Sequence, residues 1–163
     1  MENSIVVILE FLLWTLYLYV VHRVVHVLPE KLKQFHMAHH GYAVYNNDKQ
    51  HWRPNNLLLF NDNWPSTIDL WITEVIPTAL FAYVTGIWWV AVFHYLWAAV
   101  FQENTEHNSN INIPVLTCGR WHMLHHYNPD RNFSLFFRPW DILFGTYLAV
   151  DGGRGRQRQQ VGE

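Results

Sequence analysis

Three short strings of histidine hold the residues of this sequence that could do chemistry. They contain eight of its eleven histidines, spaced as His-x-x-x-His once and as His-x-x-His-His twice. Residues three and four apart are neighbours on a helix, so each string can direct two or three imidazole rings at one point. Neutral imidazole is the commonest metal ligand in proteins and binds iron, zinc, copper and nickel. The strings are His22 and His26; His36, His39 and His40; and His122, His125 and His126.

The number of these histidines predicts two metal ions. Two first-row ions need roughly eight to twelve donors, some from water or substrate, whereas one zinc ion typically takes four. The eight histidines, with His107 as a ninth, match the larger demand. A soluble carboxylate-bridged di-iron bundle would carry Glu-x-x-His pairs, and the sequence contains none. We therefore expect a dinuclear site built from histidine.

The elements that must position the histidines are expected to be apolar helices. Half of the residues are apolar and 15% are charged, against roughly 25% in ordinary soluble domains. The apolar run 5–21, continued to residue 27, can cross a bilayer, which takes about 20 residues. Its start lacks the positive charge and the cleavage site of a signal peptide.

A second apolar region predicts a helical hairpin. Its arms are residues 66–84, with a kink at Pro77, and residues 87–106, joined by a turn at Gly86. The apolar core of each arm is somewhat shorter than a full crossing requires. A re-entrant hairpin that does not cross the membrane is therefore an alternative to a transmembrane one.

The distribution of positive charge predicts the orientation in the membrane. The eleven lysines and arginines lie at 23–53, at 120–138 and in the tail at 154–158, and none precedes the first helix or lies at the hairpin turn. By the positive-inside rule, the N-terminus faces outside or the lumen, and the histidine strings and the C-terminus face the cytoplasm.

Short elements between these helices are expected to form a cytoplasmic cap. Residues 30–40 predict a helix that ends at Gly41, and residues 120–127 predict a second one. Residues 41–65 and 108–116 are expected to be loops or extended segments. The fold class is therefore an all-α integral membrane protein, with one transmembrane helix, a transmembrane hairpin and a cytoplasmic cap of short helices over a dinuclear metal site.

The domain organisation is expected to be simple. Residues 1–150 form a single membrane domain, and residues 151–163 form a basic, disordered tail whose arginines could contact anionic lipid headgroups. Cys118 is the one cysteine, which excludes an intrachain disulfide and a Cys-x-x-Cys motif.

The two remaining histidines are expected outside the metal site. His94 precedes His107 by 13 residues, about 20 Å along a helix, and it lies at the same predicted depth as Glu74. We therefore expect a hydrogen bond between Glu74 and His94. A b-type haem on His94 is the alternative, because spacings near 13 occur in haem-binding helices. His51 lies in a predicted loop and is expected at the surface.

The order of the histidines resembles the fatty acid hydroxylase/sterol desaturase superfamily of membrane di-iron oxygenases over about residues 10–148. The match includes the lone His107, Asn132 after the last string, and the ending Trp-Asp-x-x-Phe-Gly-Thr at residues 140–146. Small carotene hydroxylases share the strings but lack this ending. We expect the nine histidines to be the ligands. Asn132 and Asp141 are expected to orient them, with locking of the C-terminal segment as the alternative for Asp141 and the favoured role for Trp140.

The resemblance implies an O2-dependent di-iron oxidoreductase that hydroxylates or desaturates an unactivated C–H bond of a lipid, such as a fatty acyl chain or a sterol. Its cofactors would be two iron ions, which zinc can replace, with O2 as co-substrate. Two electrons must come from another protein, because the sequence has no nucleotide-binding fingerprint and no iron–sulfur cysteines. The resemblance implies a cytochrome b5-like donor, or a ferredoxin with its reductase. Besides this donor, we expect a lipid substrate and the membrane as partners, and no nucleic acid.

Two alternative functions remain open from the sequence. One is a carotenoid hydroxylase. The other is a non-catalytic membrane protein that binds or transports metal, which would need a polar path across the bilayer. Glu10, Asp69, Glu74 and His94 are the residues available for such a path.

Overall fold

The computed structural model describes residues 4–46, 51–61 and 63–149. The regular elements in these ranges are helices, and one isolated antiparallel bridge joins Leu116 and Phe137. Two helical segments, Ser4–Val27 and Trp64–Thr85, are long and apolar enough to cross a membrane. The predicted all-α membrane fold is confirmed. The predicted tail, residues 151–163, lies outside the described residues.

Helix α1 (Ser4–Val27) has a narrow buried stripe and a broad apolar outer face. At 1.5 Å per residue its 24 residues extend about 36 Å, which exceeds the roughly 30 Å of a bilayer's hydrocarbon core. Trp14, Leu18 and His22 lie four residues apart along the buried stripe, and His26 follows one turn later. The outer face exposes aliphatic side chains such as Leu9 and Leu13, as expected for contact with lipid.

The first arm of the hairpin is one continuous helical segment, made of α3 (Trp64–Leu70), η2 (Trp71–Val75) and α4 (Ile76–Thr85). Asn63 caps its start, because its side-chain oxygen accepts a hydrogen bond from the Ser66 backbone N–H at 2.9 Å. Gly86 ends it in the left-handed conformation, with φ 76°, which glycine adopts without a steric cost.

The second arm comprises α5 (Trp89–Leu96), η3 (Trp97–Gln102) and α6 (Glu103–Thr105). Both arms contain a π turn, η2 in the first and η3 in the second. In the first arm, Pro77 cannot donate to the carbonyl four residues earlier, that of Thr73, and this carbonyl lies within η2. The distortion that the sequence places at Pro77 therefore takes the form of a π turn just before it.

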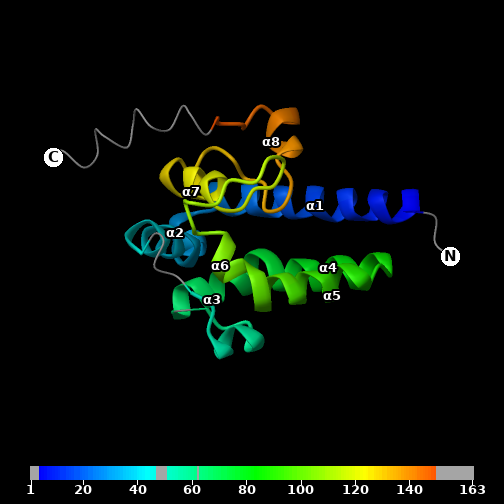
Figure 1. Cartoon of the computed structure of the whole chain (residues 1–163), viewed down its shortest axis with the longest axis horizontal. Helices are drawn as coiled ribbons and strands as arrows, with labels where there is room; N and C mark the ends of the chain where they lie inside the picture. The colour runs from blue at the N-terminus through cyan, green and yellow to red at the C-terminus, as the bar shows by residue number, and fades with distance from the viewer. Residues whose placement is uncertain (1–3, 47–50, 62, 150–163) are drawn as a thin grey trace.

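The histidine-bearing ends of these helices meet the short helices of the cap (Figure 1). Helices α1, α4 and α5 lie side by side, and α2 (Glu30–Tyr45), α6 and α7 (Arg120–Tyr127) gather at the end of α1 away from the N-terminus. The bounds of α7 are those predicted. A last short helix, α8 (Pro139–Leu143), has no counterpart among the predicted elements.

The prediction that Gly41 ends the second helix is wrong. Helix α2 continues to Tyr45, and the Asn46 backbone N–H then bonds the Tyr42 carbonyl at 2.9 Å. Glycine costs about 1 kcal/mol inside a helix, but here the next turn buries Ala43 completely. The predicted loop 41–65 therefore starts later, and it contains the 3-10 helix η1 (Pro54–Leu58).

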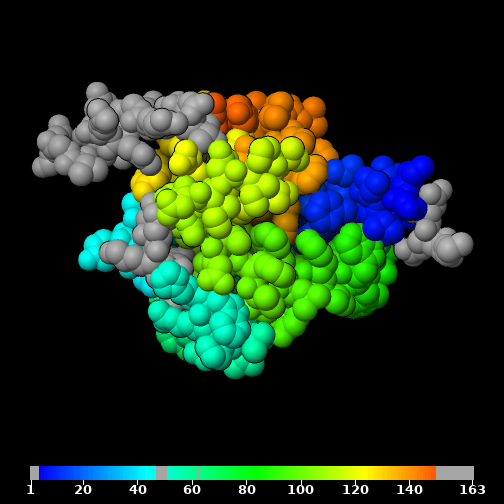
Figure 2. All heavy atoms as spheres, in the orientation of Figure 1, coloured from blue at the N-terminus to red at the C-terminus, as the bar shows by residue number. Residues whose placement is uncertain are grey.

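The segment between α6 and α7 joins His107 to the last histidine string. Its residues 108–119 cover one face of the molecule between the hairpin and the C-terminal segment (Figure 2). Gly119 has φ 69°, and a Cβ there would collide with the Ile111 carbonyl. That carbonyl instead accepts a hydrogen bond from the Arg120 backbone N–H at 2.8 Å, at the first residue of α7. Glycine is therefore required where α7 begins.

The apolar core lies between α1, the hairpin and the segment that follows α7. Its members are all buried, and the Trp14 indole N–H also donates to the Thr78 hydroxyl at 3.1 Å, which ties α1 to α4. Burial of such side chains contributes roughly 1.5–3 kcal/mol each. The core residues are Trp14, Leu18, Phe81, Ala82, Val90, Leu135 and Phe136.

The fold predicts which residues share a side of the membrane. The N-terminal end of α1 and the turn between α4 and α5 lie at the same end of the molecule, and α2 lies at the other (Figure 1). In a Cys118→Ala background, Ser4→Cys and Val84→Cys should react with an impermeant thiol reagent from the outer side. Gly41→Cys, which has open space around it, should react from the cytoplasmic side. Labelling of Gly41→Cys from the same side as Ser4→Cys would contradict this topology.

Candidate metal centre

The structure brings the nine predicted histidines into two neighbouring groups. Within each group the ligand nitrogens lie within 4.8 Å of one another, and most of these side chains are buried. The two groups meet where the His40 and His126 rings lie 4.3 Å apart between centroids. One group is His22, His26, His36, His40 and His125, and the other is His39, His107, His122 and His126.

Each His-x-x-His-His string divides between the two groups. On α2, His36 and His40 belong to the group of five and His39 to the group of four. On α7 the arrangement is reversed, with His122 and His126 in the group of four and His125 in the group of five. Residues i and i+4 share a helix face, while i+3 lies about 100° round from i+4. Because α2 packs against α7, each helix contributes a pair to one group and a single ring to the other.

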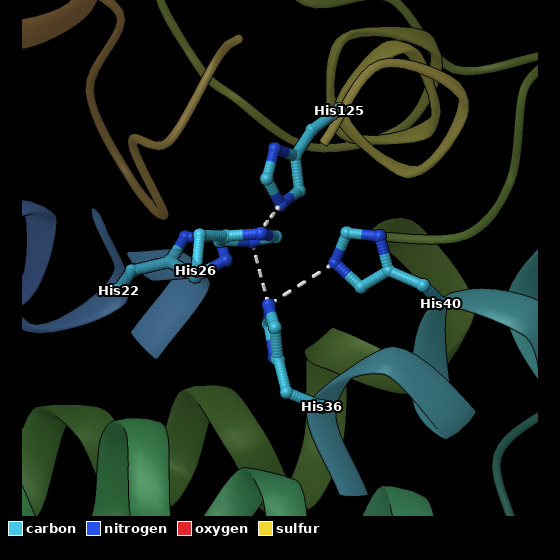
Figure 3. Close-up of side chains that lie close together, drawn as sticks. All are labelled: His22, His26, His36, His40 and His125. Atoms are coloured by element: carbon cyan, nitrogen blue, oxygen red, sulfur yellow. Dashed lines mark hydrogen bonds between the residues drawn. The ribbon is translucent and has the colours of Figure 1, made fainter. Parts of the chain in front are cut away.

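The Nε2 atoms of the group of five point at a common centre (Figure 3). His26 Nε2 lies 2.7 Å from His36 Nε2 and 3.1 Å from His125 Nε2. His40 Nε2 lies 3.1 Å from His36 Nε2. In the group of four, the Nε2 atoms of His122 and His126 are 2.8 Å apart. Contacts this short between ring nitrogens require a proton or a cation between them.

The opposite ring nitrogen of several histidines is held by the protein. His22 Nδ1 and His125 Nδ1 donate to the carbonyls of Phe133 and Arg131, at 2.7 and 2.6 Å. A carbonyl can only accept, so the proton of each neutral ring is on Nδ1 and the inward Nε2 carries a lone pair. Metal-binding histidines commonly have their other nitrogen fixed in this way.

Helix α3 fixes two histidines of α2 in the same manner. His36 Nδ1 contacts the Asp69 carboxylate at 2.8 Å, and His39 Nδ1 contacts the Ser66 hydroxyl at 3.1 Å. His36 and His39 are spaced i,i+3 on α2, and Ser66 and Asp69 are spaced i,i+3 on α3. The two helices therefore run antiparallel where these residues meet. Sequence reasoning did not assign these supporting roles to Asp69 and Ser66. The matching i,i+3 spacing is the signal that could have suggested them.

Metal ions fit the donors that are present. Lone pairs from several rings converge in each group, and a cation between them would replace repulsion with attraction. His107 is buried, and both of its ring nitrogens lack a hydrogen-bond partner in the described structure. An unsatisfied buried polar atom costs about 1–3 kcal/mol, which metal coordination would remove. The same polar region borders a cavity of about 20 Å³ between the histidines and the hairpin, enough for about one water-sized ligand.

Burial keeps the cap histidines neutral. It lowers the pKa of His36 to about 4. Burial together with neighbouring histidines also holds the pKa of His40, His125 and His126 well below 6.5. At neutral pH these rings are therefore uncharged, which is the form that binds metal.

Asn132 and Asp141 act on the histidines through the backbone. Asp141 accepts from the N–H groups of Phe133 and Ser134 at 2.8 and 3.0 Å. Asn132 has φ 56°, and its side chain bonds the Leu148 backbone through both its oxygen and its nitrogen. Together they fix residues 131–134, which present the two carbonyls that hold His22 and His125.

The ending of the chain supports this loop. The Thr146 hydroxyl donates to Asp141 at 2.7 Å and contacts the Tyr19 hydroxyl at 3.0 Å. The Trp140 indole N–H donates to the Thr15 hydroxyl at 3.1 Å. Trp140 therefore locks the C-terminal segment onto α1, as the sequence favoured.

The other singled-out residues lie outside the two groups. The predicted hydrogen bond is confirmed, because His94 Nε2 lies 3.0 Å from a Glu74 oxygen. That bond occupies the His94 Nε2 atom, which the alternative hypothesis of a b-type haem would need as the ligand of the haem iron. His51 is exposed. Glu10, on the buried side of α1, accepts from the Trp89 indole N–H at 2.6 Å.

Loss of the Asp141 charge should weaken metal binding. In Asp141→Asn, the amide nitrogen would face a backbone N–H. Residues 131–134, here called the carbonyl loop, would then lose their support. We expect a cost of about 1–3 kcal/mol in stability and metal affinity lower by about 10–100-fold. Trp140→Phe is the matched control, since it removes the bond to Thr15 but leaves the loop in place. Chelator competition and thermal melting would measure both, and equal metal affinity in the two variants would contradict the role of Asp141.

The family comparison agrees with this architecture. The model of the fatty acid hydroxylase family matches residues 7–146. The matched range contains all nine histidines, the carbonyl loop and the supporting Thr146. No solved structure matches the chain. On the family match, this chain belongs to the fatty acid hydroxylase family.

Proposed function

We propose that this protein is an O2-dependent di-iron oxidoreductase that hydroxylates an unactivated C–H bond of a lipid. The observation that carries the proposal is the convergence of nine histidines, in groups of five and four, in a chain of the fatty acid hydroxylase family. Iron, when bound there, would supply the oxidising power with dioxygen, as metal cofactors do for difficult oxidations. Zinc could occupy the same imidazole ligands without supporting this reaction.

The ligand roles follow from the two groups. The group of five would hold one ion and the group of four the other. The second ion would then have fewer protein ligands. The adjoining cavity is lined by all four histidines of this group, and by His22, His36 and His40 of the group of five. A small ligand such as dioxygen would approach the centre from this cavity.

The Phe133 ring would help to keep water away from the reacting carbon. It lies 5.3 Å from the His26 ring and 5.6 Å from the His125 ring. The cavity itself is lined mainly by polar side chains, with Leu70 and Leu135 as its apolar lining residues. The apolar outer faces of the helices would keep the protein in the bilayer, where a lipid chain can reach the histidine end laterally.

The balanced reaction requires further reactants. One C–H bond, one O2, two electrons and two protons give an alcohol and water. We propose that a cytochrome b5-like protein, or a ferredoxin with its reductase, supplies the electrons at the cytoplasmic face. Desaturation of the same chain would consume the same electrons and release two molecules of water.

The rival function, metal transport, has less support. A transport path would need polar groups that are free to bind a passing ion. Glu10 is bonded to Trp89, Asp69 to His36, and Glu74 to His94. These groups are engaged in pairs within the described structure.

Metal content and lipid products test the proposal together. Protein purified from iron-replete cells should hold close to two ions per chain, and cells that express it should accumulate a hydroxylated lipid. His125→Ala removes a ligand and should abolish the product and lower metal content. His51→Ala changes a histidine outside both groups and should behave as wild type. A content near one ion per chain in active protein, or product from His125→Ala cells, would contradict the proposal.

A further inference from the structure

The hairpin places buried carboxylates beside the metal centre. Asp69, Glu74, Glu103 and Glu106 are all at most 6% exposed, and all four line the cavity that the histidines border. Nine neutral imidazoles bring no negative charge to offset that of two metal ions. Ions transferred from water to a protein interior are costly unless opposite charge is close. The carboxylates of this cavity are therefore candidates for the compensating charge.

Glu74 is the carboxylate with the best-defined surroundings. One of its oxygens lies 3.0 Å from His94 Nε2, and the other accepts from the Gln102 amide at 2.9 Å. With His94 in its Nε2–H tautomer, both oxygens face donors, which is the pattern of a carboxylate. The His94 ring lies against Trp14 and Phe136. With a single proton on its ring, His94 would donate to Glu74 without cancelling a negative charge there.

Two distorted helical turns bring Glu74 and Gln102 together. Glu74 lies in the π turn η2, and Gln102 ends the π turn η3 on the other arm. The bond between their side chains joins the two turns. Single π turns are rare in proteins and frequently occur at functional sites. Here each turn carries a polar side chain that lines the cavity.

Gln102 also links two carboxylates. Its amide donates to Glu106 at 2.8 Å as well as to Glu74. Two buried carboxylates on one amide repel each other unless one is protonated or a positive charge lies nearby. Glu74 also lines the same cavity as histidines of both groups, among them His36 and His39.

We propose that Glu74, held by His94 and Gln102, is a charge-compensating residue that makes the metal centre prefer divalent over monovalent ions. The inference rests on the proposed metal-binding function, and Glu74 is not itself a ligand in it. Imidazole sites also bind Cu⁺, so ligand type alone does not exclude this ion. A fixed negative charge attracts a divalent ion twice as strongly as a monovalent one at the same distance. Glu74 would thereby favour iron over cuprous copper.

The test is to remove the charge and keep the shape. In Glu74→Gln, the new amide can accept from Gln102 and donate to His94, which changes tautomer, so the hydrogen bonds remain. Full-length protein in detergent would be titrated with Zn²⁺ and separately with Cu⁺, each against a competing chelator. We expect Zn²⁺ affinity to fall by roughly tenfold or more. The fall for Cu⁺ should be about half as large on a logarithmic scale.

Two matched variants separate charge from structure. Glu30→Gln removes the same charge at the exposed start of α2, where Glu30 pairs with Lys33, and should alter neither affinity by more than about twofold. Glu74→Asp keeps the charge and should keep the preference for Zn²⁺ over Cu⁺, even with a lower melting temperature. This variant decides the matter if Glu74→Gln does not fold.

Three results would overturn the inference: equal losses for the two ions in Glu74→Gln, no loss for either, or loss of the preference in Glu74→Asp. Failure of the wild-type protein to bind any metal would instead contradict the proposed function.

Discussion

A histidine can present a lone pair to a metal ion only when its proton is on the other ring nitrogen. In this protein the proton is held there by fixed acceptors, among them the carbonyls of Phe133 and Arg131 for His22 and His125. The Asp69 carboxylate does the same for His36. Because these acceptors point the Nε2 atoms inward, the rings form a site before any ion arrives. The cost of that arrangement is repulsion between lone pairs, which bound metal would remove.

Much of the rest of the structure keeps those acceptors in place. The loop 131–134 is tied to Asp141, Asp141 to Thr146, and Thr146 to Tyr19 on α1. Helix α1 thus supplies both candidate ligands and a support for the loop that orients one of them. The ending of the chain, which carries no candidate ligand, is therefore a part of the candidate metal centre. The hairpin closes the other side and contributes Asp69 and the buried carboxylates.

The sequence predicted what depends on local spacing. The i,i+3 and i,i+4 strings identified eight of the nine histidines, and the family resemblance added His107. Apolar length identified α1 and the hairpin. The depth of residues from the turn identified the Glu74–His94 bond. The division of each string between two groups could not be predicted, because it depends on how α2 packs against α7. The backbone carbonyls that accept from His22 and His125 could not be predicted from the sequence, because every residue has a carbonyl. The prediction that α2 ends at Gly41 was wrong, because the usual role of glycine at helix ends was outweighed by packing of the turn that buries Ala43.

X-ray absorption at the iron edge would test whether the histidines bind a pair of iron ions, because it reports the atoms bound to the metal. We expect the spectrum of the iron-loaded protein to show mainly imidazole nitrogen neighbours, an average of about four to five per ion, and a second metal ion nearby. A spectrum dominated by carboxylate oxygen or sulfur would rule out this centre, as would one showing an isolated metal ion with two or three imidazoles.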